Sequence, residues 1–218
     1  MILRTSTSLI RKSSTLVVLA TLLCLQVPFP AYSQSTQTFS DISHALEAIR
    51  PTFHVSTGFE NAIGDLDKTH ISLDLSTKDV ARVFDAFIAQ RTAYAWRLED
   101  GFYDVYPKVK ADSFSQLTVE NYIATDATLI EAVEAIDKLP NVQRWLTNRH
   151  LRRGDLIGGS VLVQPGAPAP LRRRQSFAFK NVRVRTILNR VNNDFGETHW
   201  VVWHEGQDVS MFFSPRSM

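Results

Sequence analysis

Residues 71–106 read ISLDLSTKDVARVFDAFIAQRTAYAWRLEDGFYDVY, and this stretch contains three periodic patterns in succession. It opens with alternating apolar and polar side chains, which is typical of a strand with one buried face. From Val80 the apolar side chains recur at the i, i+3, i+4, i+7, i+8 spacing of an amphipathic helix. Alternation returns at residues 94–98, and Asp100-Gly101 favours a tight hairpin to a further strand. The stretch therefore predicts a strand, a helix and a hairpin.

Other elements are predicted around the helix. Ser76-Thr77-Lys78-Asp79 offers a hydroxyl and a carboxylate to the unpaired N–H groups of its first turn, so we expect a capping box there. Upstream, Ala45-Leu46-Glu47-Ala48-Ile49 indicates another helix. After that helix we expect Phe53-His54-Val55-Ser56 to form a short strand and residues 58–68 to form turns.

The strand, helix and hairpin pattern recurs 104 residues later. Nine apolar positions of the first copy align at this constant offset with nine apolar positions of the second. The pairs are Leu73 and Phe177, Leu75 and Phe179, Val80 and Val184, Val83 and Ile187, Phe84 and Leu188, Phe87 and Val191, Trp96 and Trp200, Leu98 and Val202, and Val105 and Val209. Because a repeated sequence pattern indicates a repeated structural unit, we expect both copies to fold alike.

The upstream helices align at a different offset. Residues 45–49 match Ala132-Val133-Glu134-Ala135-Ile136 at an offset of 87, which is 17 less than the offset of the later elements. The second copy therefore contains an insertion, which we place in a loop at residues 149–174 because loops tolerate added length. We predict an α+β fold of two tandem small units, each with two helices packed on short β-sheets in the order β-α-β-β-α-β-β. We also expect each sheet to have one buried face.

The first 33 residues have the pattern of an export signal. Arg4, Arg11 and Lys12 precede an apolar run, and Ala31-Tyr32-Ser33 fits a cleavage site. The run, residues 16–25, is shorter than the roughly 20 residues of a membrane-spanning helix. We therefore expect a cleaved signal peptide at residues 1–33, a first unit at residues 34–110 and a second unit at residues 111–218. An uncleaved membrane anchor is the alternative.

Cleavage would leave a mature chain without cysteine or a transmembrane segment. The sole cysteine, Cys24, lies inside the apolar run, so disulfides and thiol chemistry are not expected in the mature protein. The mature chain has 21 basic and 22 acidic residues. We expect a periplasmic or secreted location.

The first unit resembles the secretin and TonB N-terminus short domain. The resemblance covers about residues 36–107, and residues 117–213 are a weaker match that contains the insertion. It rests on Ala45-Leu46-Glu47-Ala48-Ile49, Phe53-His54-Val55-Ser56, Ile71-Ser72-Leu73-Asp74-Leu75-Ser76, the Val80 to Ala89 helix and Tyr94-Ala95-Trp96-Arg97. Members of this family have a two-helix α/β fold with small sheets and lie in front of secretin pores and signal-transducing outer-membrane receptors. The resemblance implies a periplasmic protein-interaction role, with a secretin, a TonB-linked receptor or a regulator as partner. It implies no catalytic residues.

The inserted loop concentrates positive charge. It contains six arginines against Asp155, a net charge of +5, whereas the rest of the mature chain has 15 basic and 21 acidic residues. The arginines are Arg149, Arg152, Arg153, Arg172, Arg173 and Arg174. Such segregation attracts anionic partners, and the attraction weakens with salt. Nucleic acid fits the charge but not the compartment, so we do not expect it as a partner. A solvated surface hairpin is the alternative interpretation.

Trp203 is the other candidate binding residue. It lies three residues after Trp200, so on one strand the two indoles point to opposite faces. Trp200 matches Trp96 and is predicted to be core. Trp203 is therefore a candidate surface anchor, and a further packing face is the alternative.

Patterns typical of catalysis or metal binding do not occur. The histidines lack the i,i+4 or i,i+2 pairs that place two imidazoles on one face, and Ser160 lies outside any G-x-S-x-G elbow. Glu131 and Glu134 fall on the polar face of an ordinary amphipathic helix. We expect no enzyme, cofactor or metal site.

The expected function is docking of an envelope protein by strand addition at an exposed sheet edge or along the arginine-rich loop. An oligomer is possible in this interpretation. The alternative is a cell-wall glycan or small-ligand binding protein that uses Trp203 and the loop.

Overall fold

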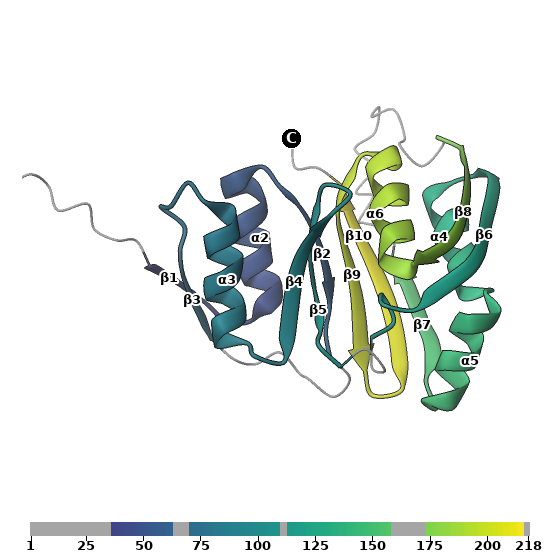
Figure 1. Cartoon of the computed structure of the whole chain (residues 1–218), viewed down its shortest axis with the longest axis horizontal. Helices are drawn as coiled ribbons and strands as arrows, with labels where there is room; N and C mark the ends of the chain where they lie inside the picture. Colours follow the sequence, from purple (N-terminus) through teal and green to yellow (C-terminus); the bar gives the residue numbers. More distant parts are fainter. Residues whose placement is uncertain (1–35, 63–69, 110–112, 158–172, 216–218) are drawn as a thin grey trace, which may run out of the picture. The chain divides into compact units, whose positions relative to one another are not determined.

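Two copies of one element order follow each other along the chain (Figure 1). The computed structural model describes residues 36–62, 70–109, 113–157 and 173–215. The first copy consists of β1 Thr36–Phe39, α2 Ile42–Phe53, β2 Ser56–Glu60, β3 Ile71–Asp74, α3 Val80–Gln90, β4 Tyr94–Glu99 and β5 Phe102–Pro107. The second consists of β6 Thr118–Ala127, α4 Leu129–Asp137, α5 Pro140–Asn148, β7 Arg152–Ile157, β8 Gln175–Arg183, α6 Val184–Phe195, β9 Glu197–Glu205 and β10 Asp208–Pro215. The α+β class is confirmed, and apart from α5 both copies follow the predicted element order.

The insertion of the second copy is not simply a loop. α5 has nine residues and no counterpart in the first copy, and Pro140 occupies its first turn, where a missing N–H is tolerated. Val142, Trp145 and Leu146 give α5 a buried face. The prediction that the extra residues lie in a loop at residues 149–174 is therefore wrong for α5, which precedes this range, and for β7, which lies within it.

Two local predictions in the first copy are also wrong. Asp79 is the N-cap of α3, and its carboxylate accepts hydrogen bonds from the N–H groups of Ala81 and Arg82, so residues 76–79 do not form a capping box. A reciprocal capping box occurs instead between Thr128 and Glu131 at the start of α4.

The predicted strand Phe53-His54-Val55-Ser56 is not formed. α2 continues through Phe53 and ends at His54, whose left-handed φ of 54° closes the last turn. The strand β2 starts at Ser56 and includes Gly58, which we had predicted to lie in a turn.

The two copies share one six-stranded sheet in the order β4-β5-β2-β9-β10-β7. Three strands come from each copy, and β2 of the first pairs in parallel with β9 of the second. Two separate two-stranded sheets, β1-β3 and β6-β8, complete the fold. Consequently the residues from 35 to 218 form one compact unit.

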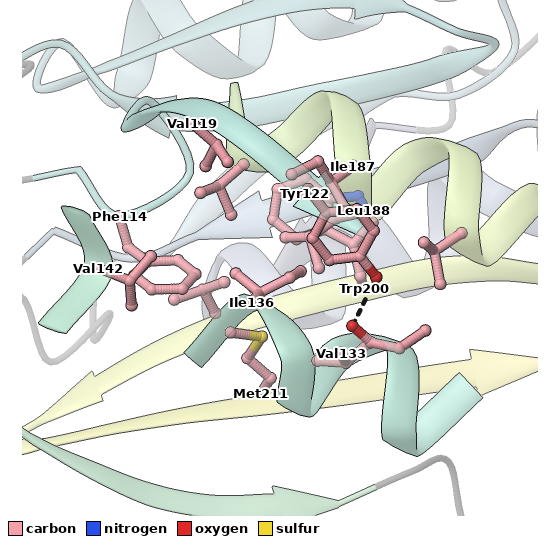
Figure 2. Packing of buried hydrophobic residues seen from close by; sticks show 14 of the residues in the cluster. Phe114, Val119, Tyr122, Val133, Ile136, Val142, Ile187, Leu188, Trp200 and Met211 are labelled. Atoms are coloured by element: carbon pink, nitrogen blue, oxygen red, sulfur yellow. Dashed lines mark hydrogen bonds between the residues drawn. The ribbon is translucent and has the colours of Figure 1, made fainter. Parts of the chain in front are cut away.

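The helices of the two copies cover opposite faces of the shared sheet. α2 and α3 pack with Phe59 and Val105, whereas α4, α5 and α6 pack with Trp200 and Met211 on the other face (Figure 2). In the second core, the hydroxyl of Tyr122 donates a 2.6 Å hydrogen bond to the carbonyl of Ala132. The prediction of one buried face per sheet is wrong here, because β2, β5 and β9 have buried side chains on both faces.

The described helices have at most 12 residues, and none of them is long and apolar enough to cross a membrane. The predicted signal peptide at residues 1–33 lies outside the described residues.

Candidate functional site

Each copy holds a tryptophan of its hairpin against the same turn of its second helix. The indole N–H of Trp96 on β4 donates to Asp85 Oδ1 at 2.9 Å, and that of Trp200 on β9 donates to Asn189 Oδ1 at 2.6 Å. Donor and acceptor are 11 residues apart in both copies. The repeat therefore extends to individual hydrogen bonds and makes β4 and β9 equivalent strands.

The pairing of β2 with β9 forms a joint between the copies, in which Gly58 lies opposite Trp200. A Cβ atom at Gly58 would lie 2.2 Å from the indole ring of Trp200 and 2.5 Å from Asp104 Oδ1. No real side chain tolerates such contacts, so the indole packs directly on the backbone of β2. Glycine is required at this position for close approach, not for a special backbone angle.

Asn61 follows the last residue of β2 and continues the hydrogen bonds to β9 with its backbone N–H and its side-chain amide. Its backbone N–H donates to Val202 O at 3.2 Å. Its side-chain amide then pairs with both backbone groups of His204, accepting from the N–H at 2.6 Å and donating to the carbonyl at 3.0 Å. The amide thus imitates a peptide group and satisfies buried polar atoms where β2 ends.

Glu60 is fully buried beside the joint and ties the segment between the copies to the sheet. Its carboxylate accepts hydrogen bonds from the Ser113 hydroxyl at 2.7 Å, the Phe114 N–H at 2.5 Å and the Ser115 N–H at 2.9 Å. His204 Nε2 lies 3.0 Å from the same carboxylate. The hydroxyl and the two N–H groups donate to the carboxylate, so its buried oxygens are satisfied by hydrogen bonds from residues 113–115.

α6 extends this contact across the first copy's strands. Arg185 is buried, with its guanidinium 3.0 Å from Glu99 and its Cζ 4.6 Å from the centre of the Tyr106 ring. Asn189 donates to Asp104 Oδ2 at 2.9 Å. Burial raises the pKa of Asp104 well above its usual range, and the hydrogen bond from Asn189 opposes this effect.

β4 has an unpaired edge, whereas its counterpart β9 is paired on both sides. Within the described parts of the chain, β4 pairs with β5 alone. Asp100 and Gly101 have positive φ angles of 50° and 82°, as the predicted tight hairpin requires. Because backbone groups alternate in direction along an antiparallel strand, those of Trp96 and Leu98 point to the open edge. The Leu98 side chain is 54 % exposed.

β7 forms the opposite end of the shared sheet. It pairs only with β10 among the strands that the structure describes, in parallel orientation. Gly154 lies in this strand, and a Cβ atom there would be 2.5 Å from Ser210 Oγ and 3.2 Å from Asp208 Cβ.

The structure gives internal partners to several of the predicted binding arginines. Arg152 pairs with Asp208 at 2.5 Å and Arg153 with Asp137 at 2.7 Å, while Arg174 lies 3.0 Å from Asp126 and 3.1 Å from Glu131. Arg149 follows α5 and is partly buried, and Arg173 is exposed. Arg172 lies outside the described residues. The described arginines therefore do not converge on one uncompensated cationic surface.

Trp203 points to the opposite face from Trp200, as predicted from their spacing, and it is partly buried. It packs against the first copy's core, where its ring centre lies 6.3 Å from that of Phe59 in an edge-on contact. Trp203 therefore belongs to a further packing face, which was the alternative expectation, and is not a free surface anchor.

A cavity of about 490 Å³ lies where α2 ends and β2 begins. It is lined by Glu47, Arg50, Pro51, His54, Val55, Ser56 and Thr198. Trp203, on which the small-ligand alternative relies, is not in this lining.

Among the described residues no group of three or more histidine, cysteine, aspartate or glutamate side chains has the geometry of a metal site.

His199 is buried near this cavity, with Nδ1 2.8 Å from Thr57 Oγ1 and 3.1 Å from Thr57 O. Burial, assisted by the positive charge of Arg50, lowers the pKa of His199 to about 3, although the hydrogen bond to Thr57 acts in the opposite direction. An unfolded histidine has a pKa of about 6.5. Between these values the unfolded state binds a proton that the folded state does not, so stability falls as the pH is lowered.

We therefore expect His199 to account for about 2 kcal/mol of stability lost between pH 6.5 and pH 5. Urea unfolding of the wild type and of His199→Gln at both pH values measures this effect as a difference, in which other titrating groups cancel. The variant should lose about 2 kcal/mol less than the wild type. Equal losses would show that His199 does not carry the dependence.

Gly58, Glu60 and Asn61 were not identified from the sequence, because they lie in the segment expected to form a strand end and turns. Their partners Trp200, Val202 and His204 are more than 140 residues away, so no local pattern could reveal them.

Comparisons of the chain with protein-family models, with curated proteins and with solved structures found no match.

Proposed function

We propose that this chain is an exported, non-catalytic protein-interaction module that docks an envelope partner by strand addition at the β4 edge. The observation that supports this proposal best is the internal joint. β9, the repeat counterpart of β4, accepts β2 as an additional parallel strand, whereas β4 leaves the same edge unpaired in the described chain.

Strand addition suits this edge physically. The outward backbone groups of Trp96 and Leu98 supply hydrogen bonds, and their side chains supply apolar surface next to them. Natural proteins usually protect such edges with charge, proline or bulges, because an open edge pairs readily with other chains. Leu98 offers no such protection. An edge of this kind is therefore expected to have a partner.

The location and the class of partner in this proposal come from the sequence. The signal-like residues 1–33 favour export, and the resemblance to the secretin and TonB N-terminus short domain favours a secretin, a TonB-linked receptor or a regulator as partner. The element order β-α-β-β-α-β-β of the first copy, which the second copy repeats apart from α5, supports that resemblance, as does the contribution of one two-stranded sheet and three further strands by each copy.

Site-specific photo-crosslinking from β4 tests the proposal. A photoreactive residue replaces Leu98 in the full chain, expressed in its native host. A matched control places the same residue at Ile123 on β6, which is 70 % exposed. We expect an adduct from position 98 and none of the same mass from position 123, and an N-terminus of the mature protein at Gln34. Absence of any adduct specific to position 98 would contradict docking at this edge.

A further inference from the structure

We propose that the cavity where α2 ends is a binding site for a small zwitterion, a compound such as an amino acid or a dipeptide that carries one carboxylate and one ammonium group. The lining includes no residue of β4, so this inference goes beyond the proposed function and does not depend on it. The volume of about 490 Å³ falls within the range of small-molecule pockets, roughly 300–1,000 Å³. Both copies contribute to the walls, because Thr198 belongs to β9 and the other lining residues belong to α2, β2 or the turn between them.

Arg50, in the last turn of α2, supplies the positive charge of the site. Its Nε atom is buried and has no hydrogen-bond partner among the described residues. Native proteins satisfy nearly all buried donors, so this N–H is expected to bond to a molecule that enters the cavity. A carboxylate fits best, because the planar guanidinium can donate two parallel hydrogen bonds to its oxygens.

Two hydroxyl groups extend the donor side of the cavity. Ser56 on β2 and Thr198 on β9 lie side by side, since the next residues, Thr57 and His199, are paired in the register of the two strands. Both side chains are half-buried. A carboxylate bound to Arg50 would therefore have a hydroxyl donor from each copy within the same cavity.

Glu47 supplies the negative charge, one helical turn before Arg50. No ion pair joins these two side chains in the described part of the chain, so neither charge is neutralised by direct contact with the other. Pro51 provides a second acceptor. It has no N–H, and the carbonyl of Glu47 therefore lacks the hydrogen bond that residue 51 of a helix would donate. An ammonium group has three donors and binds to acceptors of this kind.

These charges favour a zwitterion over a simple anion. A phosphate dianion would be attracted by Arg50 but repelled by Glu47 and by the negative end of the α2 dipole. A compound with its carboxylate at Arg50 and its ammonium group at Glu47 is attracted at both ends. Pro51 and Val55 supply apolar surface for its carbon skeleton.

NMR titrations of the isotope-labelled protein at constant ionic strength test this inference. The probes are alanine and alanylalanine, which carry both charges, propionate and ethylammonium, which carry one each, and inorganic phosphate. We expect the two zwitterions to shift the signals of residues 47–56 and 197–199. They should bind at least about tenfold tighter than the other probes, because each of those lacks one of the two charge-assisted contacts. The tighter of the two zwitterions shows whether the site takes an amino acid or a short peptide.

Two variants assign the contacts. Arg50→Gln should weaken alanine binding at least about tenfold and leave ethylammonium binding unchanged. Glu47→Gln should weaken alanine binding by a similar factor and strengthen propionate binding. Arg82→Gln on α3 and Glu134→Gln on α4 remove exposed charges outside the cavity and should bind all probes like the wild type. Near-ultraviolet circular dichroism checks that each variant is folded.

Two results with the wild type would overturn the inference. Propionate or phosphate that binds as tightly as alanine would show a simple anion site. Absence of shifts at residues 47–56 and 197–199 with every probe would show that only water occupies the cavity. Because both results come from the wild type, the inference stays testable even if Arg50→Gln does not fold. Either result leaves docking at the β4 edge intact, since the crosslink from position 98 tests that proposal separately.

Discussion

Replacing Glu60 by alanine is expected to destabilise the folded protein by about 3–5 kcal/mol, which makes this one of the most damaging single changes in the chain. The side chain is fully buried, and its carboxylate accepts hydrogen bonds from the N–H groups of Phe114 and Ser115 and from the Ser113 hydroxyl. Alanine would leave these donors and His204 Nε2 buried without a partner. Each unpaired buried donor costs about 1–3 kcal/mol. Urea unfolding of the mature protein measures the loss.

Two control variants separate this mechanism from a general loss of volume. Glu60→Gln has the same shape and keeps an acceptor oxygen, so it should cost less than Glu60→Ala, about 1–3 kcal/mol. Glu134→Ala removes an exposed glutamate of α4 and should change stability by no more than about 0.5 kcal/mol. If Glu60→Ala behaves like Glu134→Ala, the network does not hold residues 113–115 to the sheet.

Replacing Gly58 by alanine is expected to cost about 3 kcal/mol or more, although alanine adds only a methyl group. The new Cβ atom would lie 2.2 and 2.3 Å from two atoms of the Trp200 indole. The indole cannot move freely, because Trp200 is fully buried and its N–H is bonded to Asn189. The joint between β2 and β9 must therefore open or shift. Thermal unfolding followed by near-ultraviolet circular dichroism would report both the lost stability and the altered indole environment.

Gly206→Ala is the matched control for this change. Gly206 has a φ of 59° and no atom within 4 Å of an added Cβ, so the substitution affects backbone conformation without a collision. It should cost about 1 kcal/mol, as expected for alanine in the left-handed region. Equal effects of the two variants would show that close packing of Trp200 on β2 does not govern stability.

The structure also weakens the interpretation of the arginine-rich insertion as a binding surface, because several of its arginines have intramolecular partners. Arg152, Arg153 and Arg174 pair with carboxylates from β10, α4 and the end of β6, so their charge is largely used inside the molecule. The exposed pairs of Arg152 and Arg174 contribute only about 0–1 kcal/mol each and weaken with salt, whereas the pair of Arg153 with Asp137 is largely buried. Under the proposed function we expect the unpaired β4 edge to contribute more to binding than these arginines.

Most helices and strands could be predicted from the sequence, because the periodicity of each depends only on a short stretch of neighbouring residues. The spacing from Val80 to Ile88 gives α3 one buried face, and the alternation at residues 71–75 gives β3 its buried face. The alternation at residues 94–98 predicts β4 as a strand, although Leu98 on that face is exposed. The constant offset of 104 residues placed the second helix and hairpin of both copies correctly. α5 was overlooked, although Val142, Trp145 and Leu146 have helical spacing, because the repeat had no counterpart for it.

The joint between the copies could not be predicted in the same way. Periodicity reports which side of an element avoids water, but it does not report which strand edge meets which. From the sequence alone, Gly58 is typical of a turn and Glu60 of the surface. In the structure, Trp200 packs on Gly58, and the N–H groups of residues 114 and 115 donate to the buried Glu60 carboxylate. Local side-chain patterns thus specified two similar units. How those units meet depended on long-range fit and on the pairing of buried polar groups, which exist only once the strands are side by side.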